Sequence, residues 1–127
     1  MKGLIGIVIS MFLTVQILAQ SPNETKAQYN GGDKALTDYI YKSMRYPEEA
    51  QKQRLAGKSL IAFTVNEDGT ISNVRVLKSS ALLLDNEALR IIKTMPKWIP
   101  ATENGINKKE MVVLPIIFDL TRKDISY

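Results

Sequence analysis

The sequence predicts a single α+β domain in which a three-stranded antiparallel sheet carries helices packed on one face. Three observations lead to this prediction. A chain of 127 residues suffices for one domain of ordinary size. Hydrophobic residues make up 45% of it and charged residues 24%, as in folded globular proteins. Strand-like and amphipathic helical segments then follow one another in an order that fits one sheet.

The first nineteen residues have the pattern of an export signal. Met1 and Lys2 precede an apolar run that ends at Ala19, and a polar segment follows at 20–29. A positive start, an apolar stretch and a small residue before a polar segment are typical of a cleaved secretory signal. The alternative is an uncleaved membrane anchor, because an apolar run of about 17 residues is at the low end of a membrane span. We expect a signal peptide over 1–19 and a flexible lead-in over 20–29.

Two helical segments are expected next. Asp33 is a suitable N-cap for a helix that begins at Lys34. Pro47 can open a second, short helix that runs to Leu55, and Gly57 is the expected C-terminal stop. The first helix has apolar residues at a spacing of four, which predicts one buried stripe: Leu36, Ile40 and Met44.

A β-hairpin follows the helices. The segment 58–65 is rich in β-branched and aromatic residues, which predicts a strand. Asp68-Gly69 predicts a tight turn, because glycine adopts positive φ without strain. The returning strand, 70–78, changes its apolar parity near Ser72-Asn73, where we expect a bulge.

A helix over 84–95 and a strand over 111–118 complete the predicted fold. We expect Asp85 to cap the helix, and Glu87 and Arg90 to lie outside its apolar stripe. The intervening 97–109 is expected to be mainly a polar loop. If the 58–65 strand is central, all neighbours are antiparallel and the sheet order is 2-1-3. The 111–118 strand is then an edge, and Pro115 supports this, because proline in a strand is confined to edges or bulges.

Composition argues against an enzyme. The chain has neither His nor Cys, which excludes imidazole and thiolate catalysis, thiolate zinc sites and disulfides. We therefore expect no catalytic residue, no metal and no cofactor; the enzyme alternative requires a pocket in which carboxylates converge with Lys. The formal net charge of +4 is mild and no block of like charge appears, so a nucleic-acid partner is not expected.

The expected edge strand is the feature with functional content. It carries no charged residue, whereas natural proteins usually protect sheet edges with charge or cover them. One interpretation is that another segment or another copy of the protein covers it. The other is β-augmentation, in which an extended peptide adds to the edge through its backbone. The candidate residues of this edge are Met111, Val112, Val113, Leu114, Pro115, Ile116, Ile117 and Phe118.

Several short motifs along the chain resemble the C-terminal domain of TonB, the energy transducer that spans the periplasm of Gram-negative bacteria. The similarity covers residues 30–120 and leaves a polar tail at 121–127. The motifs, in order, are Tyr46-Pro47-x-x-Ala50-Gln51-x-x-Arg54-x-x-Gly57, Phe63-x-Val65-x-x-Asp68-Gly69-x-x-x-Asn73-Val74, Leu84-Asp85-x-Glu87-Ala88, Pro96-x-Trp98-x-Pro100 and Pro115-Ile116-x-Phe118.

The resemblance implies a peptide-binding function in TonB-dependent transport. Such domains bind the TonB-box peptide of outer-membrane transporters by strand addition to the last strand, here 111–118. The segment before the Tyr-Pro motif, here Ser43, Met44 and Arg45, approaches that peptide in the family. Ser43 stands where the best-known members have Gln. The motif residues Tyr46, Pro47, Gly57, Asp68, Gly69, Trp98 and Pro100 are expected to be mainly structural.

The resemblance and the export signal together predict a periplasmic protein; an inner-membrane anchored one is the alternative. About ten residues separate Ala19 from Gly31 and reach roughly 40 Å when fully extended. We therefore expect a free-standing domain that binds transporter peptides without itself delivering energy. The alternative function is a homodimerising or adaptor module whose edge strand pairs with its own copy or with another periplasmic protein.

Overall fold

The computed structural model describes residues 23–121. The expected signal peptide, the first residues of the lead-in and all but one residue of the expected polar tail lie outside this range. The elements follow in the order β1 (Glu24–Thr25), α2 (Gly32–Ser43), α3 (Glu48–Lys52), β2 (Gly57–Val65), β3 (Ile71–Lys78), α4 (Leu82–Lys93), β4 (Ala101–Glu103), β5 (Ile106–Lys108) and β6 (Glu110–Phe118).

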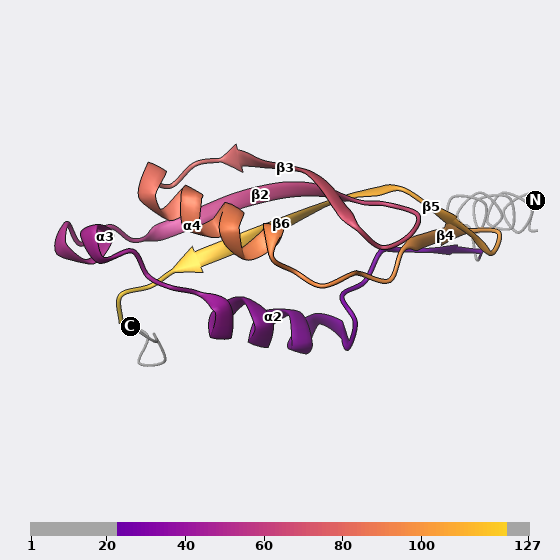
Figure 1. Ribbon diagram of the computed structural model, residues 1–127, viewed down its shortest axis with the longest axis horizontal. Helices are drawn as coiled ribbons and strands as arrows, with labels where there is room; N and C mark the ends of the chain where they lie inside the picture. Colours follow the sequence, from indigo (N-terminus) through magenta and orange to yellow (C-terminus); the bar gives the residue numbers. More distant parts are fainter. Residues whose placement is uncertain (1–22, 122–127) are drawn as a thin grey trace, which may run out of the picture.

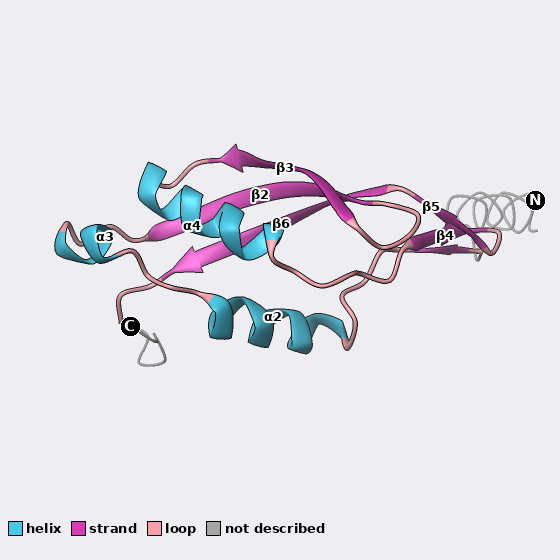
Figure 2. Ribbon diagram, in the orientation of Figure 1, coloured by secondary structure: helices cyan, strands magenta, loops and turns pink. Residues whose placement is uncertain are grey.

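The main sheet has the order β3-β2-β6, with both neighbour pairs antiparallel. This confirms the expected α+β class and the expected 2-1-3 order of the three long strands. Figure 1 shows the three strands side by side, with α2 and α4 on the same side of the sheet. The opposite face of the sheet carries no helix within residues 23–121 (Figure 2). The sheet is therefore covered on one face and open on the other.

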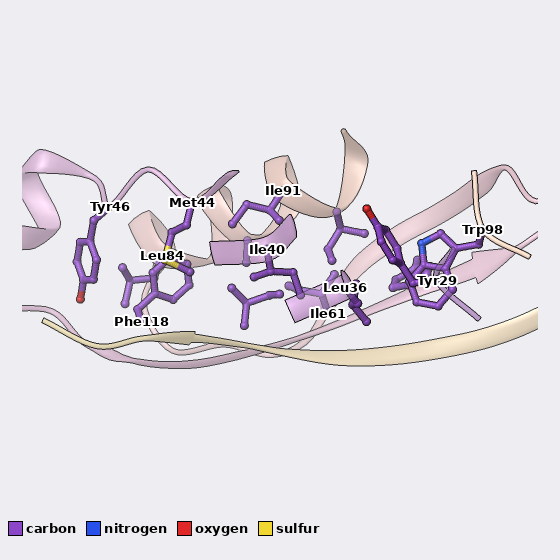
Figure 3. Close-up of a cluster of buried hydrophobic side chains, with 14 of the residues drawn as sticks. Tyr29, Leu36, Ile40, Met44, Tyr46, Ile61, Leu84, Ile91, Trp98 and Phe118 are labelled. Carbon is purple, nitrogen blue, oxygen red and sulfur yellow. The ribbon is translucent and has the colours of Figure 1, made fainter. Parts of the chain in front are cut away.

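The core lies between the sheet and the two long helices (Figure 3). Alternate residues of β2 point into it, because side chains alternate between the two faces of a strand. Ile61, Phe63 and Val65 are fully buried, as the alternation of β2 predicts. The expected stripe of the first helical segment, Leu36, Ile40 and Met44, is also buried, and so are Leu84, Ala88, Ile91 and Ile92 of α4.

The β2–β3 hairpin has the expected turn and bulge. Gly69 adopts φ 85° and its N–H donates to the Asn66 carbonyl over 2.9 Å. The register shifts where Asn73, at φ 53°, adds an extra residue to β3. A second shift near Leu77 was not expected. Each bulge bends β3 and interrupts its pairing with β2.

A second sheet, of order β1-β4-β5, is absent from the sequence-based prediction. Asn104 and Gly105 both have positive φ, as a two-residue hairpin turn requires, so much of the expected polar loop is a β4–β5 hairpin. The part of the lead-in at 23–29 is also ordered. β1 pairs with β4, and the side chain of Tyr29 is buried against Trp98 with 5.8 Å between the ring centroids. Over these residues the lead-in belongs to the folded domain.

The ends of the first two helices differ from the expected ones. Asp33 does not cap α2, since Gly31 occupies the N-cap with φ 98° and Asp33 lies in the first turn. The short helix α3 ends before Gly57. Arg54 takes the left-handed conformation, while Leu55 N–H donates to the Ala50 carbonyl over 2.8 Å. This is a Schellman-type end with Arg in the position that glycine usually occupies.

Asp85 and Glu87 are buried, which corrects the expectation of a capping residue and an outward-facing one. Ala81, not Asp85, is the N-cap of α4. Asp85 accepts hydrogen bonds from Ser59 Oγ over 2.7 Å and from Ser80 N–H over 3.1 Å, and also from the Ser79 hydroxyl. Glu87 accepts the Arg45 N–H and the Arg90 guanidinium, so both buried carboxylates have hydrogen-bond donors.

Candidate strand-pairing edge

The main sheet has two edges, and they differ in regularity. β3 forms one edge and is interrupted by two bulges, and its outer end carries Lys78. Bulges and charges are two of the devices that discourage pairing with another strand. β6 forms the other edge and pairs with β2 over nine consecutive residues without a register shift, from Gly57↔Phe118 to Val65↔Glu110. The regular edge is therefore β6, which contains the edge strand expected at 111–118.

The side chains of β6 alternate between the core and the open face. Ile116 and Phe118 are buried, and Val112 and Leu114 pack against the core. Met111, Val113 and Ile117 are 56%, 39% and 46% exposed, and Pro115 is exposed as well. The strand begins one residue earlier than expected, at Glu110, which gives it one charged residue at its start. The rest of the edge is uncharged and half of its side chains are accessible.

Pro115 indicates which backbone groups face the free edge. It stands opposite Leu60 in β2. Its nitrogen carries no proton, and strands accept proline where that nitrogen points away from the partner strand. Backbone direction alternates along a strand, so the amides of Met111, Val113 and Ile117 point the same way as the Pro115 nitrogen. The edge thus offers three donors and one gap, together with the carbonyls of the same four residues.

The segment 43–46 runs past the Phe118 end of this edge. The ring of Tyr46 meets the ring of Phe118 edge-on, with centroids 5.7 Å apart, and Figure 3 shows Tyr46 and Met44 close to Phe118. The side chain of Met44 is buried, so of the three expected approach residues only Ser43 and Arg45 remain at least partly accessible.

Two side chains of α4 hold this segment in place, and sequence reasoning missed both. Glu87 Oε2 accepts the Arg45 backbone N–H over 2.5 Å. Arg90 Nη2 donates to the Ser43 carbonyl over 2.6 Å, and its Nε donates to Glu87 Oε1 over 2.6 Å. The hydrogen bond to the Glu87 carboxylate raises the pKa of Arg90 although burial acts against it, so the guanidinium stays charged. The spacing of three between Glu87 and Arg90 predicts an ion pair on a helix. It does not predict that the two side chains also bind the backbone of Arg45 and Ser43.

Four further motif residues lie at the starts of elements or in the segments between them. Tyr46 donates its hydroxyl hydrogen to the Leu55 carbonyl, and burial raises its pKa. Gly57 opens β2 opposite Phe118. Pro47 precedes α3, and Pro100 precedes β4. Tyr46 and Gly57 thus lie at the Phe118 end of the main sheet, and Pro100 lies at the start of the second sheet.

The hairpin turn and Trp98 form one packed unit at the other end of the core. The backbone N–H of Trp98 donates to the Gly69 carbonyl over 2.9 Å. A Cβ on Gly69 would lie 2.2 Å from the Trp98 carbonyl oxygen, so only glycine fits there. The indole packs edge-on against Phe63, at 5.2 Å between centroids. Trp98 is therefore a buried core residue at this end of the main sheet.

A shallow hollow beside this turn brings together Glu67, Asp68 and Lys109. This is the residue combination that the enzyme alternative requires. Asp68, however, accepts hydrogen bonds from Thr70 Oγ1 over 2.6 Å and Thr70 N–H over 3.0 Å, which lower its pKa. A lowered pKa makes the carboxylate a weaker base, and the two bonds close the turn. No cluster of three metal-ligating side chains occurs between residues 23 and 121.

Comparison with known proteins points to one family. Residues 42–120, more than half of the chain, match the family described as Gram-negative bacterial TonB protein C-terminal. Curated relatives include Protein TonB of Helicobacter pylori, 34% identical over 77 residues, and of Pasteurella multocida, 32% identical over 114 residues. These matches cover 60% and 85% of this chain but only 26% and 43% of the relatives. The chain thus spans less than half the length of either relative.

Solved structures agree with the sequence comparison. The solution structure of the C-terminal domain of Helicobacter pylori TonB is similar to this fold with a TM-score of 0.55 and 26% identity. The similarity covers 71% of this chain and 95% of that domain. A second solution structure of the same domain gives a TM-score of 0.53, with 68% and 78% covered. In the range that the structure describes, no helix is both long and apolar enough to cross a membrane.

Proposed function

The chain belongs to the TonB C-terminal domain family, and on that premise we propose that it binds the TonB-box peptide of outer-membrane transporters by strand addition to β6. The family ties the chain to TonB-dependent transport. The proposal adds the ligand and the mode of binding. It also takes the domain to act in the periplasm, after export by the signal at residues 1–19.

The single observation that carries the proposal is the contrast between the two edges of the main sheet. An extended peptide needs a row of free backbone groups and a strand that stays regular along its length. β6 has nine residues in continuous register with β2, whereas β3 has two bulges. A strand added to β6 would extend a regular ladder of backbone hydrogen bonds. A strand added to β3 would lie against a strand whose backbone is distorted by two bulges.

The Tyr46–Phe118 contact supports a second element of the site. It holds the segment 43–46 at one end of β6, so a peptide on the edge runs toward Ser43 and Arg45. Glu87 and Arg90 fix the backbone of that segment by hydrogen bonds to Arg45 and Ser43. A fixed segment loses little conformational entropy on binding, which favours affinity.

Titration of the ¹⁵N-labelled chain 20–127 with a TonB-box peptide tests the proposal. The expected result is amide shift changes along 111–118 and at Ser43 and Arg45. Changes that avoid 111–118 contradict strand addition.

Val113→Pro is the matched variant for the same titration. Its nitrogen points away from β2, so proline there removes an edge donor and spares the β2–β6 ladder. We expect affinity for the peptide to fall about tenfold, because one of three edge donors is lost. Leu82→Ala is the control, since Leu82 is 75% exposed at the start of α4, away from the edge. Equal affinity of Val113→Pro and the unaltered chain contradicts the proposed edge.

Size-exclusion chromatography separates the proposal from the homodimer alternative. A self-pairing edge gives a stable dimer that a TonB-box peptide does not dissociate. A peptide-binding edge gives a monomer, or a dimer that the peptide dissociates. A dimer indifferent to peptide contradicts the proposal.

A further inference from the structure

The open face of the main sheet carries cations and aliphatic side chains but no acidic one. Residues directly opposite each other in an antiparallel pair share a face. Leu60 and Ala62 stand opposite Pro115 and Val113 in β6, and opposite Lys78 and Arg75 in β3. Lys58, opposite Ile117, lies on this face too. The three charged residues on the face are therefore Lys58, Arg75 and Lys78.

Arg75 lies across this face toward the proposed binding edge. Its Nη2 is 3.1 Å from Met111 Sδ, although β2 separates the two strands. Its Nη1 donates to the Asn73 carbonyl over 3.0 Å. Ala62 is fully buried although it belongs to the open face, as expected where a long side chain passes over it. No carboxylate of the described residues forms an ion pair with Arg75, so its partners are a thioether and one carbonyl.

A guanidinium in this position is suited to a carboxylate. Its donors form a planar fork that matches the two oxygens of Asp or Glu, and a thioether is only a weak acceptor. We propose that Arg75 binds a carboxylate of the strand that adds to β6, and so selects peptides with an acidic residue beside Met111. This proposal rests on the proposed function, because the added strand supplies the carboxylate.

The geometry of strand addition brings the two groups within reach. The side chain opposite Met111 on the open face has its Cβ about 4.5–5.5 Å from the Met111 Cβ. The Arg75 guanidinium already touches the end of the Met111 side chain. A Glu side chain beside Met111 therefore needs no movement of the backbone to meet the guanidinium. The peptide residues two and six positions from the one beside Met111 lie next to Val113 and Ile117. Their side chains should be aliphatic, because Val113 and Ile117 are apolar and exposed.

The face disfavours a second copy of this chain as its occupant. Two identical open faces stacked on each other bring three cations against three cations, with no acid in either. Like charges across an interface are destabilising. An acidic, aliphatic peptide meets no such repulsion.

The test is a double-mutant cycle with designed peptides. The probes are nonapeptides of alternating Val and Thr, blocked at both ends, with Glu or Gln replacing one open-face residue at successive positions. The chain is used unaltered or as Arg75→Gln, with Arg54→Gln as control, because Arg54 is exposed beyond α3 and distant from the face. We expect about fivefold tighter binding of the best Glu peptide over its Gln partner, lost in Arg75→Gln and kept in Arg54→Gln.

Two further readouts make the outcome decisive. The Arg75 Nε signal should shift with the Glu peptide and not with the Gln peptide, and the preference should decrease with salt. Equal affinity for Glu and Gln peptides in the unaltered chain overturns the role of Arg75. If Arg75→Gln loses the Gln peptide as well, Arg75 is structural and the inference is wrong. If neither these peptides nor a TonB-box peptide perturbs the amides of 111–118 in the unaltered chain, the proposed function itself fails.

Discussion

At the scale of single residues, a few positions hold the domain together through contacts that no other side chain provides. Gly69 accommodates a carbonyl that leaves no room for a Cβ. Asp85 joins β2, the 79–80 segment and α4 through three serines. Glu87 joins α4 to the segment before the Tyr-Pro motif. Each of these residues has at least one partner in a distant part of the sequence, so each stabilises the tertiary structure as well as its own element.

Gly69→Ala should destabilise the domain much more than Gly105→Ala. Both residues have positive φ, which costs an L residue about 1–2 kcal/mol. An added Cβ meets nothing within 4 Å at Gly105 but meets the Trp98 carbonyl oxygen at Gly69. We expect an additional loss of about 1–3 kcal/mol for Gly69→Ala, measured as the free energy of unfolding in urea. Equal losses for the two variants contradict this packing.

Asp85→Asn should lower the free energy of unfolding at neutral pH. It should also make that free energy decrease less as the pH is lowered. Burial opposes ionisation of Asp85 most strongly of all single effects, but bonds from Ser79, Ser59 and Ser80 together outweigh it and lower its pKa below 3.8. The charged form therefore stabilises the fold above the unfolded-state pKa, and this contribution disappears as pH falls through the folded-state pKa.

For this substitution we expect a loss of about 2 kcal/mol at pH 7. The difference from the unaltered chain should shrink between about pH 5 and pH 2. Asp38→Asn is the control, because Asp38 is exposed on α2. Urea unfolding across this pH range measures the effect, and a difference that stays constant with pH is the contrary result.

At the scale of elements, hydrophobic periodicity explains what the sequence could predict. α2, α4, β2 and the β2–β3 turn have strong periodic or turn signals, and their places are confirmed. The second sheet escaped prediction because β4 and β5 have three residues each and β1 has two, too few for a period to appear. The buried position of Glu87 was not predicted, because a charged residue on a helix is expected to face water. Its partner, the Arg45 N–H, is 42 positions away in the sequence.

Substitution of Glu87 tests the link between α4 and the 43–46 segment. Glu87→Gln keeps the size of the side chain but removes the charge that binds the Arg45 N–H and the Arg90 guanidinium. We expect a loss of about 1.5–3 kcal/mol, because hydrogen bonds to a buried charged group are involved. Amide exchange at Arg45 should accelerate by more than exchange in β2. Glu49→Gln is the control, since Glu49 is exposed in α3; unchanged exchange at Arg45 argues against the link.

At the scale of the whole molecule, one core cluster extends from the main sheet to Tyr29 and Trp98, which flank the strands of the second sheet. Tyr29 follows β1, packs against Trp98 and lies 5.9 Å from Tyr39, centroid to centroid. Trp98 contacts Phe63 in the main sheet and precedes β4. Residues 23–29 are therefore part of the domain.

The candidate site could be predicted from the sequence only in part. The uncharged sequence of 111–118 indicated the edge strand. The contact of Arg75 with Met111 across β2 could not be predicted, because it depends on the strand order and on the registers of β2 with β3 and with β6.

Tyr29→Ala should destabilise the whole domain and not only its N-terminal part. The side chain is buried and packs against Tyr39 and Trp98, and loss of a large buried ring costs about 3–5 kcal/mol. A single cooperative urea transition at lower concentration is the expected outcome. Thr25→Ala is the control, because Thr25 is exposed in β1. Two separate transitions in the Tyr29 variant contradict a shared core.

The most direct test of strand addition is hydrogen exchange at three amides of β6. Met111, Val113 and Ile117 have N–H groups that point to the free edge, while the N–H groups of Val112, Leu114 and Ile116 point to β2. Saturation with a TonB-box peptide should slow exchange at these three amides by at least about tenfold, since each becomes hydrogen-bonded. Exchange at Val112 and Leu114 should change less. If all five amides exchange at the same rates with and without peptide, β6 is not the binding edge.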